Sequence, residues 1–464
     1  MKSEKKTKLF GTDGIRARAG EFPLDSVTVQ IIGASLAEHL AELDGSRPPR
    51  IVLGRDTRES GPVIEAALTQ GAVGAGAIVE SAGIITTPGV AFLAKSLPAD
   101  AGVVISASHN PYHDNGIKIF DPSGRKLDDA TERKIEADIT EGRFRPSSGV
   151  TLGRSFEDSN DPSLTEKYLS YLRHDVARGL SLENLKIVID CAHGAASGLA
   201  PRLFSDLGAQ IIAINNRPDG RNINLNAGSL HIEGLQHRVN QEGADLGVAF
   251  DGDADRALFV DASGNFVDGD ATMWVLANFM KSRGELDGQL VVATVMTNLG
   301  LEVALRERGI SLARTDVGDK YVLDELLRSK ASLGGEQSGH IIFPKASLAG
   351  DGMITALNLV RVMREERKSL AELTRGFSRF PQVLINVRVR EKIPFENLPK
   401  VQLKAREIEE SMGDRGRLLL RYSGTESLAR VMVEGEEARQ VEAVAKDLAA
   451  VIRNEIGAGE VELT

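Results

Sequence analysis

Hydrophobic residues recur along the chain in short runs that alternate with amphipathic stretches, and three segments share one order of elements. Each predicts a strand, a loop, an amphipathic helix and a second strand. They are RIVLGRDTRESGPVIEAALTQGAVGAGAIV from Arg50, KIVIDCAHGAASGLAPRLFSDLGAQIIAIN from Lys186 and LVVATVMTNLGLEVALRERGISLART from Leu290. A repeated unit of this kind is best explained by three similar α/β domains with mixed or mostly parallel sheets. Ligands bind at the carboxyl edge of such sheets, so the loops after these strands are candidate sites.

The last part of the chain has a different pattern. PQVLINVRV from Pro381 alternates as a half-exposed strand does, and FENLPKVQLKAREIEESMGD is helical. GRLLLRYSGTESLARVMVEGE predicts two strands around a loop, and EARQVEAVAKDLAAVIRNEI closes with an amphipathic helix. This predicts a smaller α+β domain. We therefore expect four domains, over residues 1–157, 158–262, 263–380 and 381–464.

Composition narrows the class of protein. A chain of 464 residues with 42% hydrophobic and 26% charged residues predicts several ordered domains. The net charge of −10 argues against a nucleic-acid binder, although a local cluster of Arg and Lys can still hold a phosphorylated metabolite. The single cysteine, Cys191, excludes an internal disulfide and fits a reducing compartment. Neither a signal peptide nor an apolar run of membrane-spanning length stands out, so we expect a cytoplasmic protein without a membrane partner.

A serine beside a histidine follows the apolar run Ala101 to Ile105, which predicts a buried strand. The segment is ISASHNPYHDNGIKIF, with Ser108 and His109 at its centre. A hydrolase nucleophile elbow has the form G-x-S-x-G, which is absent here. The alternative is that Ser108 begins a loop and Asn110-Pro111 forms an ordinary turn. This segment alone leaves both interpretations open.

The strongest single signal is LGVAFDGDADRALFVD. An apolar strand, Leu246 to Phe250, ends in three carboxylates at alternate positions, Asp251, Asp253 and Asp255, and Arg256 follows them. In a tight loop this spacing can converge hard oxygen ligands on one cation, and an open site with few protein ligands suits Mg²⁺. A calcium EF-hand is excluded because its glycine and glutamate positions are not matched. A solvated acidic turn is the alternative, but crowded like charges are costly without a cation.

A second constellation lies in LLLRYSGTESLARVMVEG, between the two predicted C-terminal strands. Backbone and hydroxyl donors are available in the loop, and two arginines supply charge, which together predict a phosphate-binding site. The residues are Arg421, Ser423, Gly424, Thr425 and Arg430. An ordinary hairpin loop with surface arginines is the alternative.

Three further stretches are weak singly. GGEQSGH places Glu336, Ser338 and His340 on a glycine-rich loop, where the first two can contact sugar hydroxyls and the imidazole can accept a proton. A capping or turn role is the alternative for this stretch. FGTDGIR and NGIKIF add Arg16 and Lys118. A dinucleotide fingerprint fails because Val79 takes the third glycine position, and the ATP-binding G-x-x-x-x-G-K-[ST] loop is missing. Taken together, the constellations indicate phosphoryl transfer to a sugar, with Ser108 as the carrier.

These motifs resemble those of the α-D-phosphohexomutase superfamily, in the same order and over nearly the whole chain. SASHNP is similar to its phosphoserine loop, DGDADR to its metal loop, GEQSG to its sugar loop and RYSGTES to its phosphate loop. The resemblance implies a heart-shaped, four-domain enzyme that is phosphorylated on Ser108. It further implies one Mg²⁺ per chain, held by a phosphate oxygen on Ser108 and by Asp251, Asp253 and Asp255.

Within the superfamily the chain most resembles the bacterial phosphoglucosamine mutases, through DGRNINLNAGSLHIEGLQ, GGEQSGH, VGDKYV and PQVLINV. The departures Ala17, Ala227, Ala254 and Ser427 remove no group needed for transfer. The resemblance implies conversion of glucosamine 6-phosphate to glucosamine 1-phosphate, toward UDP-N-acetylglucosamine, with a sugar 1,6-bisphosphate as intermediate and activator. It also suggests a homodimer formed through the first domain.

The implied roles of single residues follow from the same resemblance. Arg16 and Lys118 would stabilise the moving phosphoryl group, His109 would orient the serine loop and Arg256 would contact it from the metal side. Lys118 and His340 are the two candidates for the proton acceptor. A glucose or mannose phosphomutase is the alternative function, and a sugar-phosphate phosphatase or non-catalytic binder would not need all of these groups.

Overall fold

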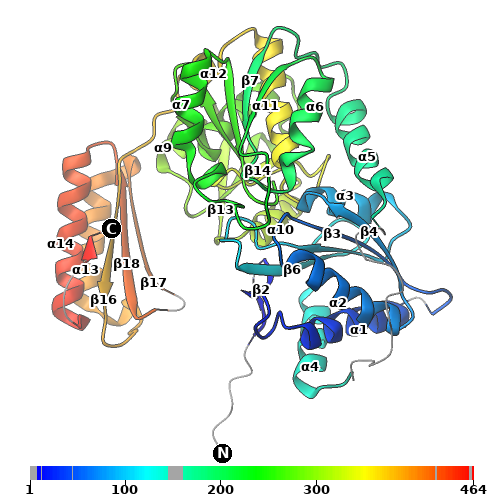
Figure 1. The fold of residues 1–464 in the computed structure, drawn as a ribbon. Coiled ribbons are helices and arrows are strands. Elements are labelled where there is room, and N and C mark those ends of the chain that lie inside the picture. The colour runs from blue at the N-terminus through cyan, green and yellow to red at the C-terminus, as the bar shows by residue number, and fades with distance from the viewer. Residues whose placement is uncertain are drawn as a thin grey trace, which may run out of the picture. The chain divides into compact units, whose positions relative to one another are not determined.

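Four sheets, each covered by helices, follow one another along the chain (Figure 1). The computed structural model describes residues 8–458 and 462–463, apart from residues 12, 44, 145–159 and 424–425. The chain forms two compact units, Met1–Met296 with Ala313–Thr374 and Thr297–Leu312 with Arg375–Thr464. In the part of the chain that is described, no helix has the length and apolarity needed to cross a membrane. The predicted domain boundaries at residues 157, 262 and 380 stay predictions.

The first sheet has the strand order β1-β2-β6-β5-β3-β4. Its strands are β1 (Phe10–Gly11), β2 (Gly14–Arg18), β3 (Arg50–Arg55), β4 (Ile78–Ile84), β5 (Ala101–Ile105) and β6 (Asp114–Phe120), and its helices are α1 (Ser26–Leu43), α2 (Gly61–Gly74), α3 (Thr87–Ser96) and α4 (Asp129–Glu141). β3 is parallel to β4 and β5, whereas β6 and β2 extend the sheet with antiparallel pairs. β5 has the predicted bounds, so the Ser108 loop leaves the carboxyl edge of the parallel strands.

The second sheet has the order β11-β10-β9-β7-β8. Its strands are β7 (Lys186–Asp190), β8 (Gln210–Ile214), β9 (Leu246–Phe250), β10 (Ala257–Asp261) and β11 (Phe266–Val267), and its helices are α5 (Pro162–Tyr171), α6 (Ala200–Asp206) and α7 (Ile232–Glu242). β7 is parallel to β8 and β9, and β10 is antiparallel to β9. The aspartate loop therefore joins two fully buried, neighbouring strands, which hold both of its ends.

The third sheet has the order β13-β12-β14-β15, with β12 parallel to β14 and β15 antiparallel to it. Its strands are β12 (Leu290–Thr294), β13 (Ser311–Thr315), β14 (Leu333–Gly335) and β15 (Ile341–Ile342), and the helices of this part are α8 (Gly269–Ser282), α9 (Leu299–Glu307), α10 (Asp319–Ser329), α11 (Gly352–Glu366) and α12 (Leu370–Leu373). The turn between β14 and β15 contains the GEQSG motif. All three predicted strand-helix-strand units are thus present, and the prediction of mixed α/β sheets is confirmed.

The C-terminal sheet is antiparallel, with the order β17-β18-β16-β19. Its strands are β16 (Gln382–Arg388), β17 (Gly416–Tyr422), β18 (Leu428–Gly435) and β19 (Glu462–Leu463), and α13 (Pro399–Met412) and α14 (Ala438–Ile456) pack against it. Helix α9 belongs to the same compact unit. The buried carboxylate of Glu434 accepts the backbone N–H of Leu299 at 3.2 Å, which ties the start of this helix to β18.

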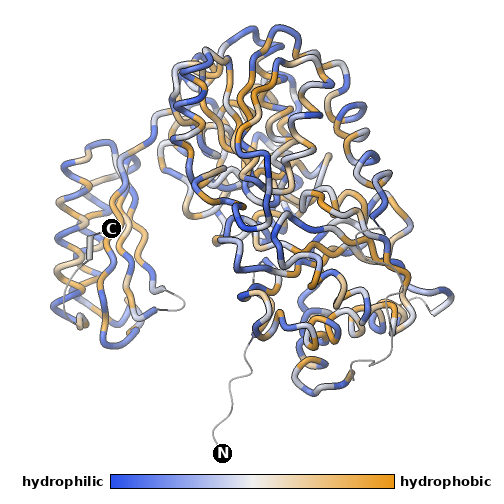
Figure 2. The backbone as a smooth tube through the Cα atoms, in the orientation of Figure 1, coloured by the Kyte–Doolittle hydropathy of each residue, from blue (hydrophilic) through white to orange (hydrophobic). Residues whose placement is uncertain are grey.

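Hydrophobic residues concentrate on the strands and on the helix faces that lie against them (Figure 2). In the first domain, α1 and α2 approach so closely that two glycines are required. A Cβ atom on Gly33 would lie 2.1 Å from the Leu68 carbonyl oxygen, and one on Gly71 would lie 1.9 Å from that of Gln30. The two helices contact each other through their backbones. This close contact lets both of them cover the first sheet, from which the Ser108 loop extends.

We expect Gly71→Ala to destabilise the protein, because its methyl group can be accommodated only if α1 and α2 separate. Overpacking of this kind costs about 1–3 kcal/mol. The measurement is the urea unfolding midpoint followed by circular dichroism. The control is Gly234→Ala in α7, where a Cβ meets open space and Ala is the better helix former. Equal midpoints for Gly71→Ala and the unmodified protein would contradict the close helix contact.

Candidate active site

Ser108 lies in a strained and fully buried position after β5. Its φ of 52° is in the left-handed region, which costs a non-glycine residue about 1 kcal/mol or more and marks a position held by its surroundings. Its Oγ donates to Asp251 Oδ2 at 2.6 Å, and its backbone N–H donates to Ser106 Oγ at 2.9 Å. The predicted serine and the predicted aspartate loop are therefore in direct contact.

Two residues that the sequence analysis missed, Arg58 and Asn224, hold this loop from both sides. The Ser108 carbonyl accepts from Arg58 Nη2 and Asn224 Nδ2, both at 2.9 Å. The Asn110 carbonyl accepts from the same two atoms, at 2.8 and 3.1 Å. Arg58 is buried and paired with Asp56 at 2.9 Å. Arg58 follows β3, so it lies at the same carboxyl edge as the serine loop. This position could have indicated from the sequence that Arg58 belongs to the site.

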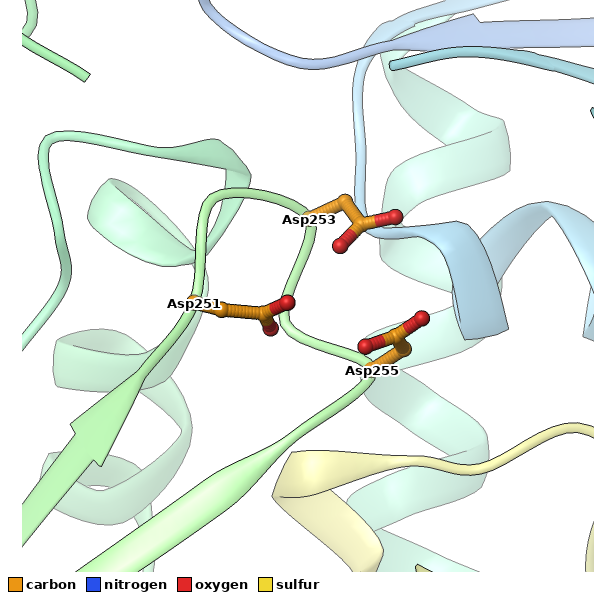
Figure 3. Close-up of side chains that lie close together, drawn as sticks. All are labelled: Asp251, Asp253 and Asp255. Carbon is orange, nitrogen blue, oxygen red and sulfur yellow. The ribbon is translucent and has the colours of Figure 1, made fainter. Parts of the chain in front are cut away.

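The side chains of Asp251, Asp253 and Asp255 converge from one loop (Figure 3). All three are buried, and each offers a carboxylate oxygen within 4.8 Å of the others. The tight turn holds Ala254 at a left-handed φ of 56°, which is unfavourable for a residue with a Cβ atom. Burial and the neighbouring carboxylates raise the pKa of Asp251 well above its usual value, because three negative charges repel one another at this distance.

A buried lysine from the first domain compensates these charges. Lys118 Nζ lies 2.9 Å from Asp253 Oδ2, 3.4 Å from Asp255 Oδ2 and 3.1 Å from Asp13 Oδ2. Burial opposes the charged form of this ammonium group, but the three carboxylates outweigh it and raise its pKa well above the usual value. Burial raises the pKa of Asp255, but Lys118 outweighs this effect and holds that pKa well below its usual range.

The aspartate loop also has the chemistry of a cation site. Asp253 Oδ1 and Asp255 Oδ1 are buried, and neither has a hydrogen-bond partner among the described residues. A buried carboxylate oxygen without a partner is costly, and a bound cation removes that cost. Oxygen donors of this kind suit a hard divalent ion. The three aspartates therefore fit a metal ion and form a candidate metal site.

Two arginines and a histidine surround Ser108. Arg16 Nη1 donates to Asn110 Oδ1 at 3.4 Å, and Arg256 Nε lies 4.0 Å from Asp251 Oδ2. Among the described residues, neither arginine has a hydrogen-bond partner for its buried Nε, although Arg256 Nε also lies 3.7 Å from Asp255 Oδ1. His109 Nδ1 lies 3.3 Å from Ser108 Oγ. Burial, together with the two arginines, lowers the pKa of His109 to about 4, so its imidazole is neutral at pH 7.

The glycine-rich turn of the third domain brings its three predicted residues into one region. Ser338 Oγ donates to Glu336 Oε2 at 3.3 Å, and both side chains are half-buried. His340 is buried with Nδ1 3.7 Å from Asp255 Oδ1 and Nε2 3.8 Å from Asp319 Oδ2. Burial opposes protonation of His340, but Asp255 and Asp319 outweigh it and raise its pKa to about 9.

A cavity of about 320 Å³ reaches this centre from the side of the first and third domains. Lys118, Asp255 and His340 line its inner end. Lys126 bridges the two domains there, with Nζ 2.6 Å from Asp13 Oδ1 and 2.6 Å from Asp319 Oδ2. The reacting centre is thus built from three domains that contribute opposite charges.

The predicted phosphate loop belongs to the C-terminal unit. Arg421 and Arg430 stand opposite each other in the β17–β18 ladder. Arg430 Nη2 lies 3.4 Å from the buried Ser423 Oγ, and its Nε is buried without a partner among the described residues. Lys392, which the sequence analysis missed, donates to the Ser423 carbonyl at 2.6 Å. Gly424 and Thr425 lie outside the described residues.

Comparisons with known proteins agree with this architecture. Models of the phosphoglucomutase/phosphomannomutase α/β/α domains I, II and III and C-terminal domain match residues 7–146, 166–264, 268–380 and 384–451. A phosphoglucosamine mutase of Solibacter usitatus (strain Ellin6076) is 49% identical over 97% of this chain and 99% of its own length. One of Rhodococcus jostii (strain RHA1) is 47% identical over 96% and 99%.

A solved structure shares the fold. The crystal structure of a phosphoglucomutase/phosphomannomutase family protein from Burkholderia thailandensis has a TM-score of 0.79 at 23% identity, and covers 97% of this chain and 99% of its own. The chain therefore belongs to the phosphoglucomutase/phosphomannomutase family and, within it, to the phosphoglucosamine mutases. It is a mutase, an isomerase.

We expect Asp253→Asn to weaken binding of Mg²⁺ at least tenfold, because it replaces one charged oxygen donor with a neutral one. Isothermal titration calorimetry with MgCl₂ measures the dissociation constant directly. The control is Asp261→Asn, at the far end of β10, where the side-chain oxygen accepts only local groups of Ser263 and Asn265. Unchanged binding in Asp253→Asn would rule out the aspartate loop as the metal site.

Asn224→Ala should lower kcat of the mutase reaction about 10- to 100-fold with little change in KM. The serine loop would lose one of its two anchors, and misplacement of a reacting atom costs on this scale. Steady-state kinetics provide the measurement. Asn222→Ala is the control, since the hydrogen bonds of this half-buried side chain stay within its own loop, with Arg217 and Asp219. Equal kcat values for the two variants would show that Asn224 does not position Ser108.

Proposed function

We propose that this chain interconverts glucosamine 6-phosphate and glucosamine 1-phosphate, through phosphorylated Ser108 and a 1,6-bisphosphate intermediate. The observation that carries the proposal is the contact of 2.6 Å between Ser108 Oγ and Asp251, beside two unpartnered aspartate oxygens and a buried lysine. The choice of an amino sugar is supported by the relatives named phosphoglucosamine mutases, two of which are 49% and 47% identical to this chain.

In the proposed reaction, the P–O bond to Ser108 Oγ breaks as a new bond forms to the free hydroxyl of the sugar phosphate. Lys118 and His340 are the two candidates for the acceptor of that hydroxyl proton. Because the pKa of each is raised in the protein without substrate, the group that accepts the proton has to lose its own proton before transfer. Lys118, Arg16 and Arg256 supply positive charge to the moving phosphoryl group, and preorganised charge of this kind is the main source of rate enhancement in phosphoryl transfer. The bisphosphate then returns its other phosphoryl group to Ser108, and the sugar leaves as its isomer.

Asp251, Asp253 and Asp255, with a phosphate oxygen on Ser108, would hold one Mg²⁺ per chain. When bound, this ion would draw negative charge away from the transferring phosphoryl oxygens. Asp251 would then exchange its hydrogen bond from the free serine for a bond to the metal. His109, neutral and adjacent to Ser108, would orient the serine loop.

The remaining predicted residues bind the rest of the substrate in this proposal. Glu336 and Ser338 contact sugar hydroxyls. The phosphate loop binds the phosphate group of the bisphosphate that is not reacting. The same loop therefore serves both orientations of the bisphosphate. Its members are Arg421, Ser423, Gly424, Thr425 and Arg430. A sugar 1,6-bisphosphate would act as activator by rephosphorylating Ser108 after loss of its phosphate.

The cellular setting that we propose is the cytoplasm, where phosphorylated hexosamines are available. The buried single cysteine is compatible with a reducing compartment. We propose a homodimer as the assembly. Size-exclusion chromatography with light scattering would distinguish it from a monomer.

The test of the function is turnover of the protein with Mg²⁺ and the matching bisphosphate on three substrates: glucosamine 6-phosphate, glucose 1-phosphate and mannose 1-phosphate. We expect turnover of the amino sugar to be clearly faster than turnover of the other two substrates. We also expect Ser108→Ala to lower the activity at least 1,000-fold, because the phosphoryl carrier is removed. Mass spectrometry should detect one phosphate on the unmodified protein and none on Ser108 in the variant.

Each other outcome has a distinct meaning. Comparable or faster turnover of glucose or mannose phosphate would assign the alternative phosphomutase function with the same chemistry. Release of inorganic phosphate without isomerisation would indicate a phosphatase. Full mutase activity in Ser108→Ala would show that the phosphoserine mechanism is wrong.

A further inference from the structure

The aspartate loop is held on both sides by the first residues of two helices. Thr87, the first residue of α3, donates its backbone N–H to the Asp253 carbonyl at 3.0 Å and its hydroxyl to Asp253 Oδ2 at 2.5 Å. Gly352, the first residue of α11, donates its N–H to the Ala254 carbonyl at 3.0 Å. Helix N-termini carry partial positive charge, so both helices favour the acidic loop between them.

The cap of α11 is held by one buried hydroxyl. Asp351 caps α11 by accepting the N–H groups of Met353 and Ile354 at 2.9 and 3.0 Å. Tyr168 Oη, from α5 in the second domain, donates to the other carboxylate oxygen of Asp351 at 2.7 Å. Tyr168 thus ties the second domain to the start of α11 in the third.

Close packing transmits the position of the α11 cap to the loop. A Cβ atom on Gly352 would lie 2.5 Å from the Arg256 carbonyl oxygen and 2.9 Å from the Phe250 ring. The start of α11 therefore presses on the two residues that flank the aspartates. Tyr168 and Asp351 are at most 3% exposed, so water does not replace their hydrogen bonds. A displaced cap would move the aspartate loop.

We propose that Tyr168 is a positioning residue for the metal site, which fixes the aspartate loop by holding Asp351 and the start of α11 in place. This inference rests on the proposed function only in that the loop binds Mg²⁺. Among the described residues, the Tyr168 hydroxyl makes no hydrogen bond to Asp251, Asp253, Asp255 or Ser108, so its effect passes through Asp351.

The first test is Tyr168→Phe, which removes one oxygen atom and keeps the ring. We expect the dissociation constant for Mg²⁺, measured by calorimetry on the unphosphorylated protein, to rise about three- to tenfold, as removal of partners that orient metal ligands typically does. In mutase assays, half-maximal activity should need correspondingly more Mg²⁺, while KM for the sugar phosphate stays unchanged.

Tyr171→Phe is the matched control. Tyr171 lies in the same helix, and its hydroxyl also reaches the third domain, where it donates to the Ala346 carbonyl at 3.0 Å. Among the described residues, the Tyr171 hydroxyl makes no hydrogen bond to a helix cap. Loss of this hydroxyl should therefore change Mg²⁺ affinity less than twofold. Equal weakening in both variants would mean general loosening between domains and would overturn the proposal.

A second variant breaks the same contact from the other side. Asp351→Asn keeps an oxygen for the α11 cap but cannot offer two acceptor oxygens, so it should weaken Mg²⁺ binding as Tyr168→Phe does. Unchanged Mg²⁺ affinity in the folded variants would overturn the proposal, even if their melting temperatures fall. Unmodified protein that binds Mg²⁺ without mutase activity would instead contradict the proposed function and leave the role of Tyr168 intact.

Discussion

Three carboxylates buried within one five-residue loop are the constraint on which the rest of the site depends. Asp251, Asp253 and Asp255 repel one another where water cannot screen them, so positive charge must come from elsewhere in the fold. Lys118 reaches them from β6, which runs antiparallel beside β5, the strand that precedes the Ser108 loop. The N-termini of α3 and α11 add partial charge through backbone contacts. Among the described residues, two aspartate oxygens still lack a hydrogen-bond partner, and a divalent cation would satisfy that remaining need.

Ser108, the proposed carrier of the phosphoryl group, is held in place by rigid hydrogen bonding of a strained backbone. Ser108 keeps its left-handed conformation because its N–H and carbonyl are both fixed by buried groups. Arg58 comes from the same domain and Asn224 from the next, so the loop is correctly placed only when both domains are folded. In the proposed reaction, a serine fixed in this way would transfer a phosphoryl group along one line with little reorganisation.

Sequence patterns predicted much of this arrangement, since strands and motifs are local features. β5 and β9 have the predicted bounds, and Ser108 and the aspartates follow them as expected. The antiparallel extensions β1, β2 and β6 were not predicted, because their short mixed patterns carry weak periodicity. Arg58, Asn224 and Tyr168 were missed because each acts on a residue far away in the chain, which no local pattern indicates.

The sequence by itself therefore determined the fold class, the order of the domains and the types of chemical group available, because these depend on residue identity and on near neighbours. Tertiary structure decided which of those groups meet. The contact between Ser108 and Asp251 joins residues 143 positions apart, and that between Tyr168 and Asp351 joins residues 183 apart. Such contacts arise only when whole sheets and helices pack, and burial then sets the charge state of each group.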